Sequence, residues 1–283
     1  MTLLQIMGLA IVQGAAELLP VSSSAHVIVA EKLMGLDPTT PEMTMLLVML
    51  HTGTMFAVIV YFWNAWKESF FSSKAVFWES AKRIFAATMV TGIIGLALKV
   101  LIEKLFMKNV PHAEIEQLFG NMSLISASLA AAGLLIFYAG MKTREASLGH
   151  SVDFRQSCLV GAVQGICLPF RGFSRSGSTI SAGLLLGVSR RKIEEFSFAL
   201  AVVLTPPVIA REAWRLLKDQ HHAGASLAGM FMPGILGMAF SFIAGLLALK
   251  WLSNWLEEGR WHFFGVYCLA ASATVFLLHR GGF

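Results

Sequence analysis

Charged residues are scarce in this sequence. Asp, Glu, Lys and Arg together make up 14% of the 283 residues, whereas soluble domains carry about 25%. Hydrophobic residues make up 56%, and the mean hydropathy is +0.67. A composition this poor in charge excludes an ordinary soluble domain and indicates an integral membrane protein.

Two features of secreted and metal-bound proteins are also missing. The three cysteines, Cys158, Cys167 and Cys268, lie in or beside apolar segments without metal-ligand spacing, so we expect them to pack as small hydrophobic residues. No basic region precedes the first apolar segment, and Gln13 and Glu17 interrupt it. We therefore interpret this segment as part of the mature protein and not as a cleaved signal peptide.

Long apolar runs take the place of the missing charge. A helix needs about 20 apolar residues to cross roughly 30 Å of hydrocarbon. Six runs approach that length: 43–63, 84–102, 122–140, 195–212, 228–252 and 262–278. A transmembrane barrel would instead show alternation over strands of about ten residues. The sequence therefore predicts an all-α polytopic membrane protein with six transmembrane helices.

The basic residues gather in short loops between these runs. A net charge of +5 would suggest nucleic-acid binding in a soluble chain, but membrane topology explains this distribution better. Three loops are predicted to be cytoplasmic, with basic residues Lys67, Lys74, Lys82 and Arg83; Lys142, Arg144 and Arg155; and Arg190, Arg191 and Lys192. The loop with Asp37 and Glu42 and the loop 103–121 suit the outer side. Against the charge rule, the loop 211–226, with Arg211, Arg215 and Lys218, must also be external.

Two further apolar segments are broken by similar polar turns. The first runs from Val12 to His26 and the second from Val163 to Thr179. Both contain Val-Gln-Gly, then Leu-Pro, then Ser-x-Ser followed by a small residue. Polar groups at membrane depth are costly and usually functional.

The two breaks suggest an internal repeat. An offset of about 151 residues divides one membrane domain, 1–283, into repeats of about 1–150 and 151–283, each with one broken segment and three spans. Because three is odd, the halves are predicted to have inverted topology. The pieces beside each break are too short to span, so we expect two re-entrant helix hairpins that line a cavity. Two Pro-kinked helices are the alternative.

The first break carries a carboxylate, hydroxyls and an imidazole. Gln13 and Glu17 share a helix face one turn apart, where a divalent cation such as Mg²⁺ or helix-packing hydrogen bonds would suit the carboxylate. Ser22, Ser23 and Ser24 precede His26, which supplies a nucleophile and a proton carrier unless His26 is simply a core residue. His51 is a further candidate for the lining of the same cavity.

The second break has the groups that a phosphate needs. Arg175 lies between Ser174 and Ser176, followed by Gly177 and by Thr179, which we expect to open the next helix. A helix N-terminus and a guanidinium both bind phosphate oxygens. An ion pair between Arg175 and Glu17 is the structural alternative and is compatible with this role. Taken together, the breaks predict a phosphoryl-transfer site reached from the membrane.

These motifs resemble the integral-membrane undecaprenyl-diphosphate phosphatases, also called bacitracin-resistance proteins. Gln13 to Glu17 match that family's (Glu/Gln)-x-x-x-Glu motif, residues 20–26 match Pro-Val-Ser-Ser-x-x-His, and residues 172–179 match Gly-x-Ser-Arg-Ser-Gly-x-Thr. The likeness covers the whole chain. It implies a multi-pass protein of the bacterial inner membrane with six spans and two re-entrant hairpins. The implied reaction is hydrolysis of undecaprenyl diphosphate to the monophosphate lipid carrier and phosphate.

The resemblance also implies roles for individual residues. Glu17 and Gln13 would bind a divalent cation, Mg²⁺ or Ca²⁺, or Glu17 would activate the nucleophile; Ser23 would attack, with His26 as proton carrier or rival nucleophile. Arg175 would hold the diphosphate with Ser174, Ser176, Gly177 and Thr179, and Ser22 and Ser24 would also contact it. Gln164 and Arg171 are further candidates in the second break.

This chain departs from the family pattern in three places. Arg171 stands where proline often precedes the glycine, Ser24-Ala25 replaces Thr-Gly, and Gln13 replaces a more acidic choice. A second arginine at the break would grip the diphosphate or extend to the membrane interface. With a single carboxylate at the first break, metal dependence stays open.

One rival function comes from another class. Inverted repeats with broken helices are typical of transporters, so a transporter or flippase of a small anion or polyprenyl phosphate is the alternative to a phosphatase. The serine and histidine turn favours the phosphatase, because transport needs no nucleophile. The charge pattern favours a periplasmic or extracellular opening, and the oligomeric state is left open, with a homodimer among the options.

Overall fold

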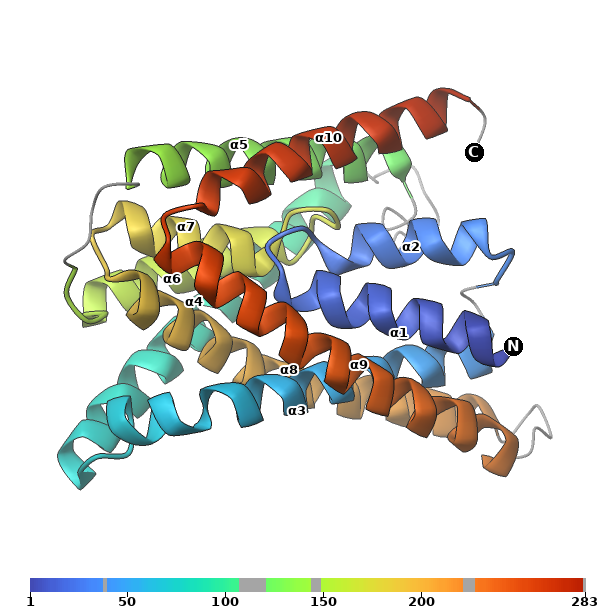
Figure 1. The fold of residues 1–283 in the computed structure, drawn as a ribbon, viewed down its shortest axis with the longest axis horizontal. Coiled ribbons are helices and arrows are strands. Elements are labelled where there is room, and N and C mark those ends of the chain that lie inside the picture. The colour runs from blue at the N-terminus through green and yellow to red at the C-terminus, as the bar shows by residue number, and fades with distance from the viewer. Residues whose placement is uncertain (38–39, 107–120, 144–148, 221–226, 282–283) are drawn as a thin grey trace. The chain divides into compact units, whose positions relative to one another are not determined.

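The computed structural model describes residues 1–37, 40–106, 121–143, 149–220 and 227–281. All regular elements in these ranges are helices, and an isolated backbone bridge joins His150 to Val188. In chain order the helices are α1 (Leu3–Leu18), α2 (Ser23–Leu33), α3 (Pro41–Ser69), α4 (Lys74–Phe106), α5 (Met122–Lys142), α6 (Phe154–Cys167), α7 (Arg175–Leu185), α8 (Arg190–Gln220), α9 (Leu227–Glu257) and α10 (Trp261–Arg280) (Figure 1). The prediction of an all-α protein is confirmed.

Six of the described helices are long and apolar enough to cross a membrane. They are α3, α4, α5, α8, α9 and α10, and each contains one predicted span. The helices extend beyond the apolar runs: α4 begins at Lys74, ten residues before the predicted start at 84. This happens because a helix continues through polar turns that lie outside the hydrocarbon, where hydropathy gives no signal.

Parts of the predicted loop pattern change. Residues 211–220 are not a loop, because α8 continues to Gln220; Arg211, Arg215 and Lys218 therefore lie on that helix. Residues 107–120 of the predicted outer loop, Arg144, and residues 221–226 lie outside the described residues. The three cysteines are free thiols, and Cys167 and Cys268 are buried, as their expected packing role requires.

Each break is a turn between two helices and not a kink in one. Pro20 lies between the end of α1 at Leu18 and the start of α2 at Ser23, and Pro169 lies between α6 and α7. The two helices of each pair pack against each other. Both pairs open with a capping box, Thr2 with Gln5 in α1 and Asp153 with Gln156 in α6, which satisfies the first backbone N–H groups.

The chain divides into two compact units. The first unit comprises Met1–Leu19, Ser23–Asn64 and Ala201–Leu252. Its core is apolar and joins α1 to α3, with Ile6, Leu9, Ala10, Met43, Leu46 and Leu50 buried. Glycines let α9 approach these helices closely: a Cβ at Gly14 would lie 2.6 Å from the Ala244 Cβ, and one at Gly53 would collide with the Met238 carbonyl oxygen.

The second unit comprises Pro20–Ser22, Ala65–Leu200 and Ser253–Phe283. In it α5 packs along α10, where the Ser272 hydroxyl donates to the Ser126 carbonyl (2.7 Å). α4 packs on α6, and their backbones come close at Gly161, where a Cβ would collide with the Ala87 carbonyl. The outer side of α4 is exposed, with only 11% of its span buried.

The division into two inverted repeats, about 1–150 and 151–283, stays a prediction. The element order is compatible with them, because a pair of short helices followed by three long helices occurs twice along the chain. The two compact units instead combine segments from both halves.

Candidate functional site

The turn after α1 holds a strained serine. Ser22 has φ of +69°, and its side chain is buried. A residue with a Cβ seldom adopts this left-handed region, and such strain is concentrated at functional turns. We predicted Ser22 to Ser24 and His26 as a turn. The structure instead places Ser23, Ser24 and His26 on the first turn of α2, so that Ser23 and His26 are three residues apart on one helix face.

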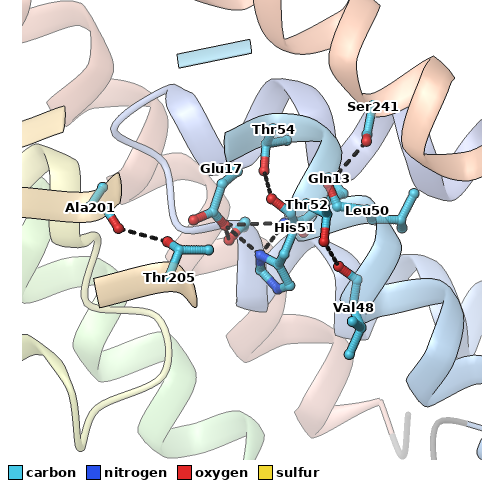
Figure 2. A network of polar contacts seen from close by, with 11 residues as sticks. Gln13, Glu17, Val48, Leu50, His51, Thr52, Thr54, Ala201, Thr205 and Ser241 are labelled. Carbon is cyan, nitrogen blue, oxygen red and sulfur yellow. Dashed lines mark hydrogen bonds and ion pairs between the residues drawn. The ribbon is translucent and has the colours of Figure 1, made fainter. Parts of the chain in front are cut away.

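Glu17 is the centre of a polar network in the first unit (Figure 2). Its Oε2 accepts a hydrogen bond of 2.5 Å from the Ser23 hydroxyl and one of 3.2 Å from the Gln13 amide nitrogen. The i,i+4 pairing of Gln13 with Glu17 is the one that the sequence predicted. The Ser23 bond is as short as charge-assisted O–H···O⁻ bonds are, which places a carboxylate where it can accept the hydroxyl proton.

His51 of α3 joins this network through Gln13. The Gln13 amide nitrogen lies 2.9 Å from the His51 Nδ1, while Nδ1 is 3.7 Å from the Glu17 Oε2. An amide N–H only donates, so the His51 Nδ1 is the acceptor of this hydrogen bond. Gln13 thus connects the carboxylate and the imidazole, and the direct contact between them is the weaker one.

Sequence reasoning missed the hydroxyl groups that hold the backbone around His51. Thr54 donates to the His51 carbonyl (2.9 Å), and Ser241 of α9 donates to the Leu50 carbonyl (3.0 Å). Ser241 is 191 residues away from Leu50 in sequence. No local pattern links them, so only the fold reveals this support (Figure 2).

The second break presents the start of α7. Ser174 is the N-cap, since its hydroxyl accepts from the Gly177 N–H (3.2 Å), and Arg175 is the first helical residue. Our prediction that Thr179 opens this helix is wrong. Thr179 lies one turn inside, donates to the Arg175 carbonyl (2.8 Å) and lies 2.7 Å from the Ser197 hydroxyl of α8. Ser176 is buried and Arg175 is half-buried at the helix start.

The turn before α7 is fixed by close packing. Gly172 has φ of +100°, and a Cβ there would lie 2.5 Å from the Ile125 carbonyl oxygen of α5. Arg171 precedes it, half-buried in the same turn. Gln164 is fully buried, and its amide donates to the Thr91 hydroxyl (3.2 Å). This hydrogen bond joins α6 to α4, so it is a helix-packing contact. Burial raises the pKa of Cys167 to about 12, so its thiol stays protonated beside this turn at neutral pH.

The turn of the first break and the start of α7 lie together in the second unit. A Cβ at Gly177 would be 3.1 Å from the Pro20 Cβ, and the Cys268 thiol of α10 donates to the Pro20 carbonyl (3.3 Å). The unit therefore brings the two Leu-Pro breaks into contact through Pro20. Glu17 and Ser23 belong to the first unit and Arg175 to the second, so an ion pair between Glu17 and Arg175 stays a prediction.

The metal prediction meets a sparse donor set. Among the residues that the structure describes, no group of three or more His, Cys, Asp or Glu side chains could hold a metal ion. Glu17 is the carboxylate at the first break, and the amide group of Gln13 turns its nitrogen toward it. Such a set suits a cation that shares its shell with substrate phosphates, as Mg²⁺ commonly does, and not a closed protein cage.

Comparison with known proteins places this arrangement in a family. The family described as "Bacitracin resistance protein BacA" matches residues 6–274. "Undecaprenyl-diphosphatase 2" of Acinetobacter baylyi is 58% identical over 98% of both chains, and "Undecaprenyl-diphosphatase" of Moorella thermoacetica is 34% identical over 99% of this chain and 100% of its own. "Undecaprenyl-diphosphatase" of Aquifex aeolicus is 32% identical over 94% of each. The chain thus belongs to the bacitracin resistance protein BacA family.

Proposed function

We propose that this protein is an integral-membrane phosphatase that hydrolyses undecaprenyl diphosphate to undecaprenyl phosphate and phosphate. The observation that carries this function is the 58% identity to an undecaprenyl-diphosphatase over nearly the full length of both chains. The short bond between Ser23 and Glu17 agrees with it, because it pairs a hydroxyl nucleophile with a base.

Ser23 is the proposed nucleophile. Glu17 accepts the hydroxyl proton as the Ser23 Oγ attacks the terminal phosphorus, and the bond to the bridging oxygen breaks. Undecaprenyl phosphate leaves, and the phosphate remains on Ser23. Water then cleaves the serine phosphoester, with Glu17 as base, and frees inorganic phosphate. His26, on the same helix face as Ser23, carries protons to the leaving group and is the rival nucleophile.

Arg175 is the proposed phosphate-binding residue. Its guanidinium can form paired charge-assisted bonds to phosphate oxygens at the start of α7. Ser174 and Ser176 would present backbone N–H groups and hydroxyls at the same helix start. Gly177, whose own N–H caps the helix on Ser174, would let the phosphate approach closely, and Ser22 and Ser24 would contact the substrate from the first break. Thr179 supports this helix start from one turn inside, through Ser197. We propose that Arg171 adds a second positive charge for the diphosphate.

A divalent cation, Mg²⁺ or Ca²⁺, would be held by Glu17 and Gln13. When bound, it would neutralise charge on the phosphate oxygens. The protein residues themselves keep their roles: Glu17 orients and deprotonates Ser23, and Gln13 fixes the carboxylate against His51.

The proposed topology has six spans and two re-entrant hairpins, α1 with α2 and α6 with α7, in two inverted repeats. The repeated order of two short and three long helices supports it. Two facing hairpins entering from opposite sides would account for the matching Ser-x-Ser breaks. On this topology the first hairpin enters from the periplasmic or extracellular side, where we propose that the site opens.

The transporter alternative finds no support in the comparisons. The full-length relatives carry the names of diphosphatases, and transport would leave the bond between Ser23 and Glu17 without a purpose.

The decisive test is phosphate release from undecaprenyl diphosphate by the purified protein, with and without a chelator. We expect Ser23→Ala to lower release by at least about a hundredfold, as losing a nucleophile or its base does, while the helical circular dichroism spectrum is retained. Thr52→Ala is the control, because the Thr52 hydroxyl only donates to the Val48 carbonyl of its own helix. Full activity of Ser23→Ala would refute the role of Ser23, and no hydrolysis by the parent protein would revive transport.

A further inference from the structure

A cavity with two basic side chains in its lining lies in the second unit, apart from both breaks. Its volume is about 90 Å³, and it lies where the end of α3, the start of α4, the segment before α6 and the start of α8 converge. Its polar lining residues are Ser69, Ser80, Arg83, Ser151 and Lys192, and the other lining residues are apolar.

The charge that lines this cavity is positive. Of the residues that the structure describes, Arg83 and Lys192 line it and no Asp or Glu does. Two nearby carboxylates pair with these cations without lining the cavity: Glu79, whose side chain is 68% exposed, pairs with Arg83, and Glu195 accepts from both Arg191 and Lys192. With two cations on one buried carboxylate, positive charge is left over at the start of α8.

The cations are held in place but keep donors to spare. The Lys192 ammonium bonds to the Ser69 hydroxyl (2.6 Å) and to the Glu195 Oε2 (3.2 Å), which leaves its third N–H. Arg83 uses one of its five N–H groups, on Glu79. The Ser69 hydroxyl in turn donates to Glu195 (2.6 Å), so one buried carboxylate orders this side of the cavity.

Two serine hydroxyls add hydrogen-bonding groups to the cavity. Ser80 is only 8% exposed, whereas Ser151 is exposed at the cavity's edge toward solvent. A hydroxyl both donates and accepts, so each can bond to a phosphate oxygen. Two cations with spare donors and two hydroxyls together fit a tetrahedral oxyanion.

The cavity also collects one or more residues from each of the three basic loops predicted to be cytoplasmic. Ser69, Ser80 and Arg83 come from the first, Ser151 from the second and Lys192 from the third. Basic pockets between membrane helices on that side suit the head groups of anionic lipids.

We propose that this cavity binds the phosphate group of an anionic molecule on the cytoplasmic side of the membrane, separate from the site of hydrolysis. Two sources share this chemistry: the head group of an anionic lipid and free inorganic phosphate.

The test uses the full-length protein in nanodiscs and three variants that each change the charge by one unit. Arg83→Gln and Ser151→Glu alter the cavity, whereas Lys82→Gln removes an exposed neighbouring charge that does not line it. Native mass spectrometry measures phosphatidylglycerol retained from mixed phosphatidylglycerol and phosphatidylcholine nanodiscs. Calorimetric titration measures inorganic phosphate binding in phosphatidylcholine alone.

We expect binding to fall about tenfold in Arg83→Gln and Ser151→Glu and to be retained in Lys82→Gln, as the loss of a charge-assisted bond predicts. A fall in lipid retention assigns the cavity to a head group, and a fall in phosphate affinity assigns it to the free ion. Hydrolysis of undecaprenyl diphosphate and the melting temperature should stay within the range of the Lys82→Gln control, which excludes misfolding. Equal binding by all three variants in both assays would overturn the proposal.

Discussion

At the scale of single residues, Gln13 holds two groups at once. Its amide nitrogen is within hydrogen-bond distance of both the Glu17 carboxylate and the His51 ring. Replacement of Gln13 by a second carboxylate would place like charges on adjacent helical turns, where they repel each other. The glutamine therefore holds the Glu17 carboxylate beside Ser23 without adding charge.

This arrangement predicts a positioning role for Gln13. Gln13→Leu should lower kcat about fivefold, the value of one neutral hydrogen bond, with KM nearly unchanged, because the Gln13 amide nitrogen bonds to Glu17 and His51 and acts through them. Steady-state kinetics of phosphate release from undecaprenyl diphosphate measure kcat and KM separately for Gln13→Leu and the parent protein.

His51→Gln and His51→Ala are the matched pair for that prediction. The glutamine side chain can accept from Gln13 as the ring does, so it should restore much of the activity that alanine loses. Equal loss in both variants would show that the ring itself, and not the hydrogen bond, is required.

Arg175 gives a sharper residue-scale prediction. Arg175→Lys keeps the charge but loses the planar fork, so phosphate release should fall roughly tenfold to a hundredfold, the equivalent of about 1.5–3 kcal/mol for one charge-assisted bond. Arg155→Lys, at an exposed position of α6, is the control. Activity of Arg175→Lys within about threefold of the parent would instead assign Arg175 a structural role.

At the scale of helices, glycines determine how closely α9 approaches α1 and α3. Gly53→Ala should lower the stability of the first unit by about 1–3 kcal/mol, the usual cost of overpacking, because the added methyl collides with the Met238 carbonyl and the Ser241 hydroxyl. Thermal unfolding in detergent measures it. Gly92→Ala in α4 meets nothing within 4 Å and should leave the melting temperature unchanged or raise it.

The helices also show how far sequence reasoning reaches. The spans were predictable because bilayer thickness imposes a length on apolar runs, and the breaks were predictable because proline ends a helix. The start of α7 was not predictable in this way. Hydropathy rises only near Thr179, whereas the helix already starts after Ser174, whose hydroxyl accepts from the Gly177 N–H. The pairing of Gln13 with Glu17 follows from helical periodicity, whereas the contact with His51 depends on how α1 meets α3.

At the scale of the whole molecule, charge distribution predicts orientation. Ser151→Cys should react with a membrane-impermeant maleimide only in inside-out vesicles, because its loop is predicted to be cytoplasmic. Asp37→Cys should react only in right-side-out vesicles. Of the native thiols, Cys167 and Cys268 are buried and Cys158 is half-buried. Both variants are therefore made in a protein that lacks Cys158, so that the maleimide does not label it. The reverse labelling pattern would contradict the proposed opening of the site.

The exposed side of α4 has a consequence for sequence change. Phe85, Ile93 and Leu96 are each more than 60% exposed, while Ala87 and Thr91 are fully buried against α6. Exchanging one lipid-facing apolar residue for another alters few protein contacts, but enlarging Ala87 would separate two backbones. In a complete mutational scan, α4 should therefore tolerate many apolar substitutions on one side and almost none on the other, so that the helix evolves at two different rates.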